Sequence, residues 1–217
     1  MTRVALPPLR IMQDSREPHL DAGDHEGALF APWRIVGGKR VEVPCERVTL
    51  REGDYSLPGC ALWKPIGDDG PWRGEPFAVI ERKALGDAIS TVIGGGVNAL
   101  GEATANRDRF AEELGRMREY AFRTIVIEGT MGDVQREASE PGRRFSAHSV
   151  LASYLAFAPR FGVQVLWAGS RGGAEYAIGT MLARIWDEYV GGPACKKAQA
   201  RGDAMPWIGA GIRAEEK

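Results

Sequence analysis

Cysteine is scarce in this sequence, and its placement excludes two classes of protein. The 217 residues contain three cysteines, Cys45, Cys60 and Cys195, which are widely separated and form no Cys-x-x-Cys pair. Such spacing supports neither a disulfide framework nor a zinc site, and it is typical of a reducing compartment. We therefore expect a cytoplasmic protein.

Long apolar runs are also missing. The longest is far shorter than the roughly 18 residues that a membrane-spanning helix needs. The N-terminal MTRVALPPLR has no apolar segment followed by a small-residue cleavage site. With 44% apolar and 26% charged residues, the sequence predicts a soluble protein that does not contact a membrane.

An excess of positive charge is the third absence. The formal net charge is −1, so the surface as a whole cannot bind nucleic acid by charge alone. One stretch, 106–123, is locally rich in arginine: Arg107, Arg109, Arg116, Arg118 and Arg123. These arginines form either a solvated helix face spaced by glutamates or a local contact surface for nucleic acid, and the sequence leaves both interpretations open.

Hydrophobic periodicity predicts an α/β domain with one main core. Strand patterns occupy 10–18, 33–50, 77–83, 123–129 and 162–169. Helical patterns begin at Leu85 and occupy 110–120, 146–159 and 173–189. Alternation in the second half indicates parallel strands joined by helices, while the first half indicates an antiparallel meander. We expect a central mixed sheet flanked by helices.

Charged residues crowd the end of one predicted strand, VIERKALGD, at 79–87. Side chains alternate along a strand, so Glu81 and Lys83 share one face while Arg82 projects from the other. Taken alone, Glu81 and Lys83 could be a surface ion pair at a frayed strand end. Further acids stand at other strand ends, however, at Asp14, Asp54 and Asp87.

Each of these aspartates has an ordinary explanation as a turn residue or a helix start. Together they predict a metal site, because Mg²⁺ prefers oxygen ligands that converge from neighbouring strands. A metal there would lower the pKa of a bound water and neutralise charge on a phosphate. An adjacent lysine could orient the water or stabilise the transition state. The chemistry indicated is metal-dependent phosphodiester hydrolysis.

Three motifs in these segments resemble a known family. DSRE at 14–17, GDY at 53–55 and ERKALGD at 81–87 are similar, in order, to the nuclease domain of the XPF family (ERCC4-type) of structure-specific endonucleases. The resemblance extends over about 9–190. It implies a restriction-endonuclease-like core of the PD-(D/E)XK type, with Mg²⁺ or Mn²⁺ as cofactor and DNA as substrate.

The resemblance also implies roles for individual residues. It makes Asp14, Asp54 and Glu81 the metal-ligating acids and Lys83 the catalytic lysine. Supporting roles fall to Arg16, Arg82 and Asp87, and Glu17 is carried over with them. Arg82 would act through its backbone carbonyl or through an ion pair. The helix that carries Arg107, Arg109 and Arg116 is expected to contact DNA.

The sequence departs from the family pattern in several places. Segments near 59–76 and 94–106 are longer than expected and could gate the site. The glycine run at 94–96 is typical of a flexible loop. The nuclease domain would span 1–190, with a loosely ordered tail at 191–217 anchored by Trp207. This leaves no room for a helicase or a helix-hairpin-helix domain, so we expect a stand-alone nuclease of a bacterial or phage-infected cell, acting in repair, recombination or phage DNA processing.

One alternative is a catalytically silent subunit that binds DNA or dimerises. Another is an RNA-processing or exonucleolytic enzyme on the same fold, because the chemistry of phosphodiester hydrolysis does not determine the sugar. Retention of all the acids and the lysine favours the enzyme. A homodimer could form through Ile185, Trp186 and Tyr189, although these residues could equally pack on the sheet. A protein partner could supply additional grip on DNA.

Overall fold

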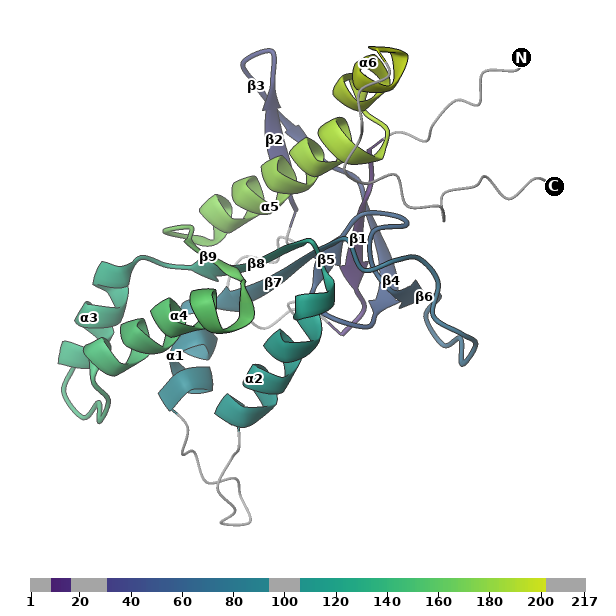
Figure 1. Cartoon of the computed structure of the whole chain (residues 1–217). Helices are drawn as coiled ribbons and strands as arrows, with labels where there is room; N and C mark the ends of the chain where they lie inside the picture. The colour runs from purple at the N-terminus through teal and green to yellow at the C-terminus, as the bar shows by residue number, and fades with distance from the viewer. Residues whose placement is uncertain (1–8, 17–30, 94–105, 202–217) are drawn as a thin grey trace.

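A computed structural model describes residues 9–16, 31–93 and 106–201 (Figure 1). Its centre is a seven-stranded mixed sheet with the order β6-β4-β1-β5-β7-β8-β9. The strands are β1 Ile11–Asp14, β4 Cys45–Leu50, β5 Tyr55–Ser56, β6 Trp63–Lys64, β7 Ala78–Ala84, β8 Phe122–Glu128 and β9 Gln164–Trp167. The expected α/β class, with a central mixed sheet flanked by helices, is confirmed.

Strand directions agree with the expectation in the second half and differ in the first. β7, β8 and β9 are parallel, and β5 is antiparallel to both β1 and β7. β1 and β4, however, are parallel, so the predicted antiparallel meander is wrong here. The reason lies in their connection, which contains a separate hairpin of β2 (Trp33–Val36) and β3 (Lys39–Glu42). It returns the chain to the beginning of β1, where Ile11 N donates to Pro44 O at 2.8 Å.

Helices cover both faces of the sheet (Figure 1). They are α1 Leu85–Ile93, α2 Asn106–Arg116, α3 Met131–Ser139, α4 Ala147–Phe161, α5 Arg171–Ile185 and α6 Pro193–Arg201. Residues of α1, α2, α3 and α4 pack with Val79, Ile125 and Ile127 on one face. α5 packs with Ile80 and Val126 on the other. Instead of the single core that we expected, the sheet separates two cores, because β7 and β8 bury both of their faces.

The end of the described chain differs from the irregular tail predicted for 191–217. Residues 193–201 form α6. Ala, Lys, Gln and Arg are strong helix formers, and Pro193 is well suited to the first helical position. The predicted anchor, Trp207, lies outside the described residues.

The segment 59–76 is part of the folded structure. Cys60 and Ala61 are fully buried, and β6 extends the sheet by pairing with β4 through Thr49↔Lys64 and Leu50↔Trp63. A further bridge joins Trp63 to Arg73. This segment therefore forms an edge of the sheet, while 94–105, the other segment considered as a gate, lies outside the described residues.

Candidate active site

The end of β7 places a carboxylate and an ammonium side by side in a nearly buried position. Glu81 and Lys83 are only 6% and 8% exposed. Lys83 Nζ lies 3.0 Å from Glu81 Oε1 and 3.3 Å from Asp87 Oδ2, and it lies 4.3 Å from the centre of the Phe110 ring. The pleat therefore orients the two side chains as predicted, and Lys83 is held by two carboxyl groups and an aromatic face.

The two groups respond differently to burial. Burial raises the pKa of Glu81 to about 8, and the charge of Glu113 acts in the same direction, while Lys83 opposes it. Burial lowers the pKa of Lys83, but the charges of Glu81 and Asp87 outweigh this, and the pKa ends above its ordinary value. Lys83 is thus an ammonium at neutral pH, and Glu81 holds a proton more tightly than an exposed glutamate.

Asp54 is held against β7 by a tight turn. Gly53 has φ +64°, and a Cβ there would overlap Val79 Cγ2 and lie 3.0 Å from Ile80 O. Asp54 N donates to Ile80 O at 2.9 Å, and Asp54 Oδ2 accepts from the backbone N of Arg82 at 2.6 Å. Glycine is therefore required beside Asp54 both by its left-handed conformation and by the close approach of β7.

Arg82 supports the site from the opposite face of the strand. Its guanidinium Nη1 lies 2.7 Å from Glu128 Oε1 on β8. The ion pair that we considered is present, and the backbone N–H of Arg82 donates to Asp54 Oδ2.

Asp14 ends β1 and is anchored on two sides. It is 3% exposed. Its Oδ1 accepts from Leu50 N at 3.0 Å and its Oδ2 from Arg16 Nε at 2.6 Å. Arg16 Nη2 donates in turn to Leu50 O at 2.7 Å. Asp14 N also donates to Asp54 O at 2.8 Å, which brings the ends of β1 and β5 together.

These residues line one cavity of about 490 Å³. Of the residues singled out in the sequence, the cavity brings together Asp14, Arg16, Asp54, Glu81, Lys83, Arg109 and Arg116. Asp87 contacts Lys83, with its side chain 58% exposed, and Arg107 is exposed on α2 and is not among the residues that line the cavity. Glu17 lies outside the described residues. Acids from strand ends and cations from α2 thus face the same space.

Sequence reasoning missed three lining residues, Arg51, Glu52 and Glu113. Glu52 is 4% exposed, and its two oxygens accept from Arg116 Nε at 2.9 and 3.0 Å. Burial raises the pKa of Glu52 despite the nearby Arg116 and Arg51. In one of the two interpretations of this stretch, Glu113 is a glutamate that spaces the arginines on a solvated helix face. Its position four residues after Arg109 and three before Arg116 was the available signal, because this spacing places the three on one side of a helix.

Four of the five arginines in 106–123 divide into two groups, and Arg107 belongs to neither. Arg109 and Arg116 line the cavity. Arg118 Nη2 donates to Arg160 O at 2.6 Å, while Arg123 donates to Phe161 O at 3.1 Å and to Tyr120 O. Arg118 and Arg123 therefore bind backbone carbonyl groups. Of these four arginines, only Arg109 and Arg116 are both exposed and part of the cavity lining.

The donor chemistry of the cavity suits a hard divalent cation, because Mg²⁺ and Mn²⁺ select carboxylate oxygens. Within the described part of the chain, however, no three acidic, histidine or cysteine side chains lie close enough together to hold a metal ion as they stand. Asp14 is turned to Arg16, Asp54 to the backbone of Arg82, and Glu81 to Lys83. The residues present fit a cation in kind, and rotation of these side chains would be needed for them to converge.

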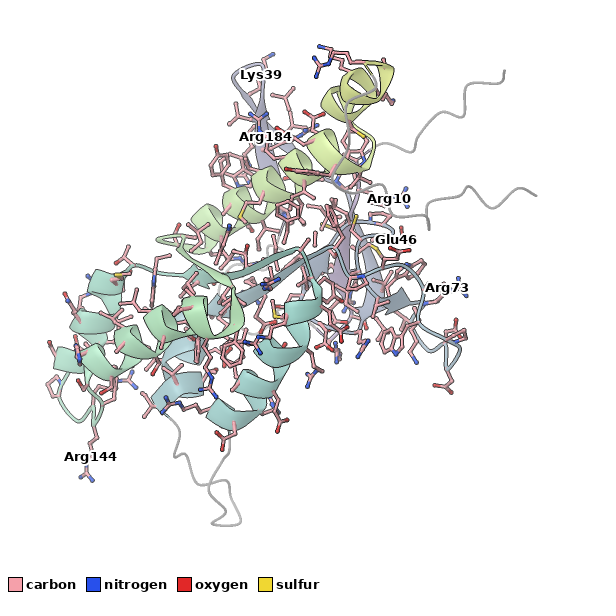
Figure 2. The ribbon with its side chains drawn as sticks, in the orientation of Figure 1. Arg10, Lys39, Glu46, Arg73, Arg144 and Arg184 are labelled. Atoms are coloured by element: carbon pink, nitrogen blue, oxygen red, sulfur yellow. The ribbon has the colours of Figure 1, made fainter. Side chains whose placement is uncertain are left out.

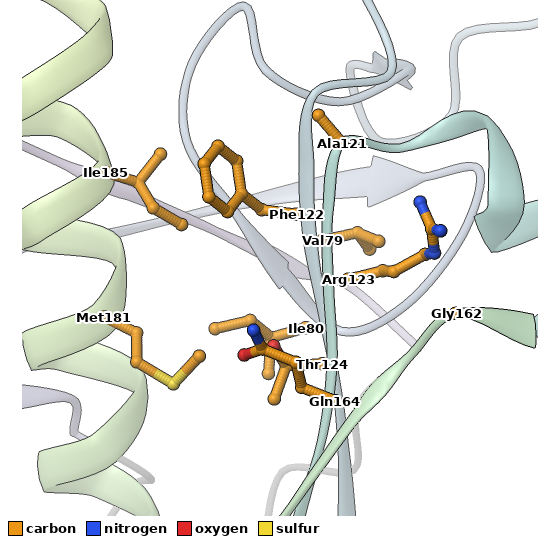
Figure 3. Close-up of a pocket in the computed structure, with 10 residues that line it drawn as sticks. All are labelled: Val79, Ile80, Ala121, Phe122, Arg123, Thr124, Gly162, Gln164, Met181 and Ile185. Atoms are coloured by element: carbon orange, nitrogen blue, oxygen red, sulfur yellow. The ribbon is translucent and has the colours of Figure 1, made fainter. Parts of the chain in front are cut away.

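A second, smaller cavity of about 70 Å³ lies between the sheet and α5 (Figure 3). Met181 and Ile185 approach it from α5, and Arg123 and Gln164 belong to the strands. No acid, histidine or cysteine is among the ten described residues that line it. It offers no carboxylate, imidazole or thiolate to a metal, so the larger cavity is the candidate active site.

The apolar stripe considered for dimerisation packs on the sheet. Ile185 is 8% exposed. The ring of Tyr189 lies 5.9 Å from that of Phe77 and 5.2 Å from that of Phe122, centre to centre.

Among the described residues, no helix combines the length and the apolar character required to cross a lipid bilayer.

Comparison with known proteins adds a family and a fold likeness. The family model for the ERCC4 domain matches residues 14–174, and no curated protein matches the chain. In structure, the chain is similar to XPF from Aeropyrum pernix, with a TM-score of 0.46 and 15% identity over 92% of this chain and 75% of that one. It is also similar to XPF from Aeropyrum pernix in complex with DNA, with a TM-score of 0.47 and 16% identity over 93% and 76%.

Proposed function

The chain belongs to the ERCC4 domain family, and on that premise we propose that it is a divalent-metal-dependent DNA endonuclease that acts on branched or flap structures. One observation carries the proposal. The acids Asp14, Asp54 and Glu81, the ammonium of Lys83 and the guanidinium groups of Arg109 and Arg116 line a single cavity. This combination matches the needs of phosphodiester hydrolysis, in which cations must stabilise charge on a phosphate.

Asp54 and Glu81, with Asp14 beside them, would hold Mg²⁺ or Mn²⁺. The cation would supply a water of lowered pKa and neutralise phosphate charge. Lys83 is kept protonated by Glu81 and Asp87 and is fixed against Phe110. It can therefore present a compact positive charge to the attacking water or to the phosphate oxygens in the transition state.

The remaining residues position these groups. The backbone N–H of Arg82 orients Asp54, while the ion pair between Arg82 and Glu128 ties β7 to β8 behind the site. Arg16 and Leu50 N orient Asp14. Arg109 and Arg116 line the same cavity and would contact phosphates of a bound strand, because guanidinium groups suit such contacts.

The test is cleavage of labelled duplex, single-stranded, flap and fork DNA, and of matching RNA, with Mg²⁺, with Mn²⁺ or with EDTA. Wild type is compared with Glu81→Gln and Lys83→Ala. The matched controls are Glu46→Gln and Lys39→Ala, at exposed positions that do not line the cavity (Figure 2).

We expect metal-dependent cutting that falls at least about 100-fold in both site variants and stays unchanged in both controls. Cutting that persists in EDTA would contradict the metal requirement. If the wild type binds DNA without cutting it under any condition, the chain is a silent subunit and the proposed activity is wrong.

A further inference from the structure

Glu52 is a buried carboxylate to which the mechanism described so far assigns no role. It is 4% exposed and lines the cavity. It stands two residues before Asp54, in the turn where Gly53 approaches β7, and the backbone before it is held by Arg51 N, which donates to Leu62 O at 2.8 Å. A carboxylate in a cavity that receives phosphates repels them unless a cation compensates its charge. Glu52 therefore needs a cationic partner inside the cavity.

Arg116 of α2 is that partner. Its Nε donates to both carboxylate oxygens of Glu52, at 2.9 Å and 3.0 Å. The side chain of Arg116 is 49% exposed, whereas that of Glu52 is 4% exposed. One edge of the guanidinium group is thus bound to a buried anchor, and this contact does not use the N–H groups of Nη1 and Nη2. Because all the donors of a guanidinium lie in one rigid plane, fixing one edge also orients the other.

The backbone of Arg116 is held by other contacts. Arg116 ends α2, and Leu114 and Met117, before and after it in the chain, are both 0% exposed in the core. The core therefore fixes the point from which the side chain of Arg116 extends. It does not fix the direction of that side chain, because a long arginine side chain keeps considerable rotamer freedom until a partner holds it. Glu52 supplies the partner before any substrate arrives.

Building on the proposed function, we propose that Glu52 is a positioning residue, which orients Arg116 so that its Nη1 and Nη2 meet a phosphate of DNA in the cavity. Glu52 acts through Nε of Arg116 and does not itself contact the substrate. Because Glu52 and Asp54 belong to one turn, the contact also holds the end of α2 beside the acids of the site. DNA then binds to an arginine that is already ordered, so less entropy is lost on binding.

Glu119 provides a matched control within the same chain of ion pairs. Arg51 Nε lies 3.6 Å from Glu52 Oε1, and Arg51 Nη1 lies 3.8 Å from Glu119 Oε2. The side chain of Glu119 is 56% exposed, and Glu119 is not among the residues that line the cavity. Glu119→Ala therefore removes a carboxylate from this chain of ion pairs but leaves the contact between Glu52 and Arg116 in place.

The experiment is a double-mutant cycle on the full chain, with the affinity for flap DNA measured by fluorescence anisotropy in Ca²⁺. In the wild-type background we expect Glu52→Ala to weaken binding about 3- to 10-fold, because the arginine must then be ordered by the phosphate itself. In the Arg116→Ala background the same change should leave the affinity unchanged or raise it, because it removes a carboxylate that Arg116 no longer compensates. Glu119→Ala should bind within about twofold of its parent in both backgrounds.

Glu52→Gln separates positioning from a role in stability. Its amide oxygen can still accept a hydrogen bond from Nε, so it should restore part of the affinity that Glu52→Ala loses, but only while Arg116 is present. Equal losses from Glu52→Ala in both backgrounds, in step with a lower melting temperature, would overturn the assignment in favour of a purely structural role. A loss of the same size in Glu119→Ala would overturn it in favour of overall charge.

The remaining outcomes distinguish this assignment from the proposed function. If Glu52→Ala does not fold, the cycle is measured with Glu52→Gln, and the absence of any coupling with Arg116 overturns the assignment in the same way. Wild type that neither binds nor cuts DNA would overturn the proposed function as well. Wild type that does both, beside independent effects of Glu52 and Arg116, overturns only the role of Glu52.

Discussion

Glu81 combines deep burial with a neighbour of like charge. Its pKa is raised from 4.5 to about 8, first by burial and then by Glu113, against the pull of Lys83. In the unfolded chain the same group loses its proton near 4.5. Between these two values the folded state therefore binds more protons than the unfolded state, and stability decreases as the pH rises.

We accordingly predict that the metal-free protein loses stability between about pH 5 and pH 8 because of this group. Glu81→Gln cannot ionise, so over the same interval its free energy of unfolding should increasingly exceed that of wild type. The difference should reach a few kcal/mol, since each unit of pKa shift corresponds to about 1.4 kcal/mol. Urea unfolding in EDTA at pH 5, 6.5 and 8 measures the difference. A constant difference between the two proteins would show that Glu81 does not hold its proton in the folded state.

Gly53 is the second residue whose local requirement is strict. Its φ is +64°, and a Cβ would overlap Val79 and approach the carbonyl of Ile80. Gly38 offers a matched control, because its φ of +78° is also left-handed but a Cβ at that position would meet no atom within 4 Å.

Gly38→Ala should therefore cost only the conformational strain, about 1 kcal/mol. Gly53→Ala should cost that and more, because β5 must move away from β7, and it should also lower DNA cleavage by displacing Asp54. Chemical unfolding and cleavage rates measured on both variants give the comparison. Equal losses of stability with intact cleavage would mean that the turn relaxes without moving the carboxylate.

At the scale of the element, α3 shows how much a helix can depend on its first turn. Its only described buried residue is Val134, so packing contributes little to it. Its start is fixed by a capping box in which Thr130 Oγ1 accepts from Asp133 N at 3.0 Å and Asp133 Oδ2 accepts from Thr130 N at 2.7 Å. Caps of this type satisfy backbone donors that have no partner within the helix.

Thr130→Ala should lower the stability of the protein by about 1 kcal/mol, and Thr130→Ser should keep most of it because the hydroxyl remains. The variants differ in their thermal midpoints, and cleavage should be unaffected because Thr130 does not line the cavity. A full loss in the serine variant as well would assign the effect to the methyl group rather than to the cap.

The elements that could be predicted from the sequence are those in which buried apolar residues recur at a regular spacing. β7, β8 and α4 bury enough apolar residues to show their period, and Ser146 does cap α4, accepting from Ser149 N at 3.4 Å. The sequence did not predict α3, because a single buried residue, Val134, gives no periodic apolar pattern. The direction of β4 was missed because a strand's own sequence does not encode the neighbour that it joins, and here the connection from β1 decided it.

At the scale of the whole molecule, charge is nearly balanced, with a formal net charge of −1. Charged side chains such as Lys39, Arg73 and Arg144 are spread over the periphery (Figure 2). On the proposed function, the arginines at the cavity supply the attraction to DNA, and binding should depend steeply on salt because it releases counterions from the phosphates.

We predict that Arg116→Ala weakens DNA binding and lowers the slope of log affinity against log salt by about 1. Arg144→Ala removes the same charge at an exposed position away from the cavity and should leave that slope unchanged. Fluorescence anisotropy with Ca²⁺ in place of Mg²⁺, at several salt concentrations, gives both slopes. Equal changes in the two variants would indicate that DNA is attracted by overall charge rather than by the cavity.

The site residues that could be predicted from the sequence are those that belong to its motifs. Asp14, Asp54, Glu81 and Lys83 stand at strand ends, and the side chains of neighbouring strands meet where those strands end. Glu113 shares one side of α2 with Arg109 and Arg116, but whether this side faces the cavity depends on where α2 packs, and that placement is fixed by Phe110 and Leu114 against the sheet.

The parallel pairing of β7 with β8 also limits when the site can form during synthesis of the chain. The two strands are separated in the chain by α1 and α2, so a ribosome must release residues up to Glu128 before β7 can acquire its second neighbour. Until then Glu81 and Lys83 belong to a strand with one side unpaired. On the proposed function, we expect a nascent chain arrested before Phe122 to be unable to cut DNA, and the same chain extended past Ile185, so that α5 can cover the other face of the sheet, to be able to do so.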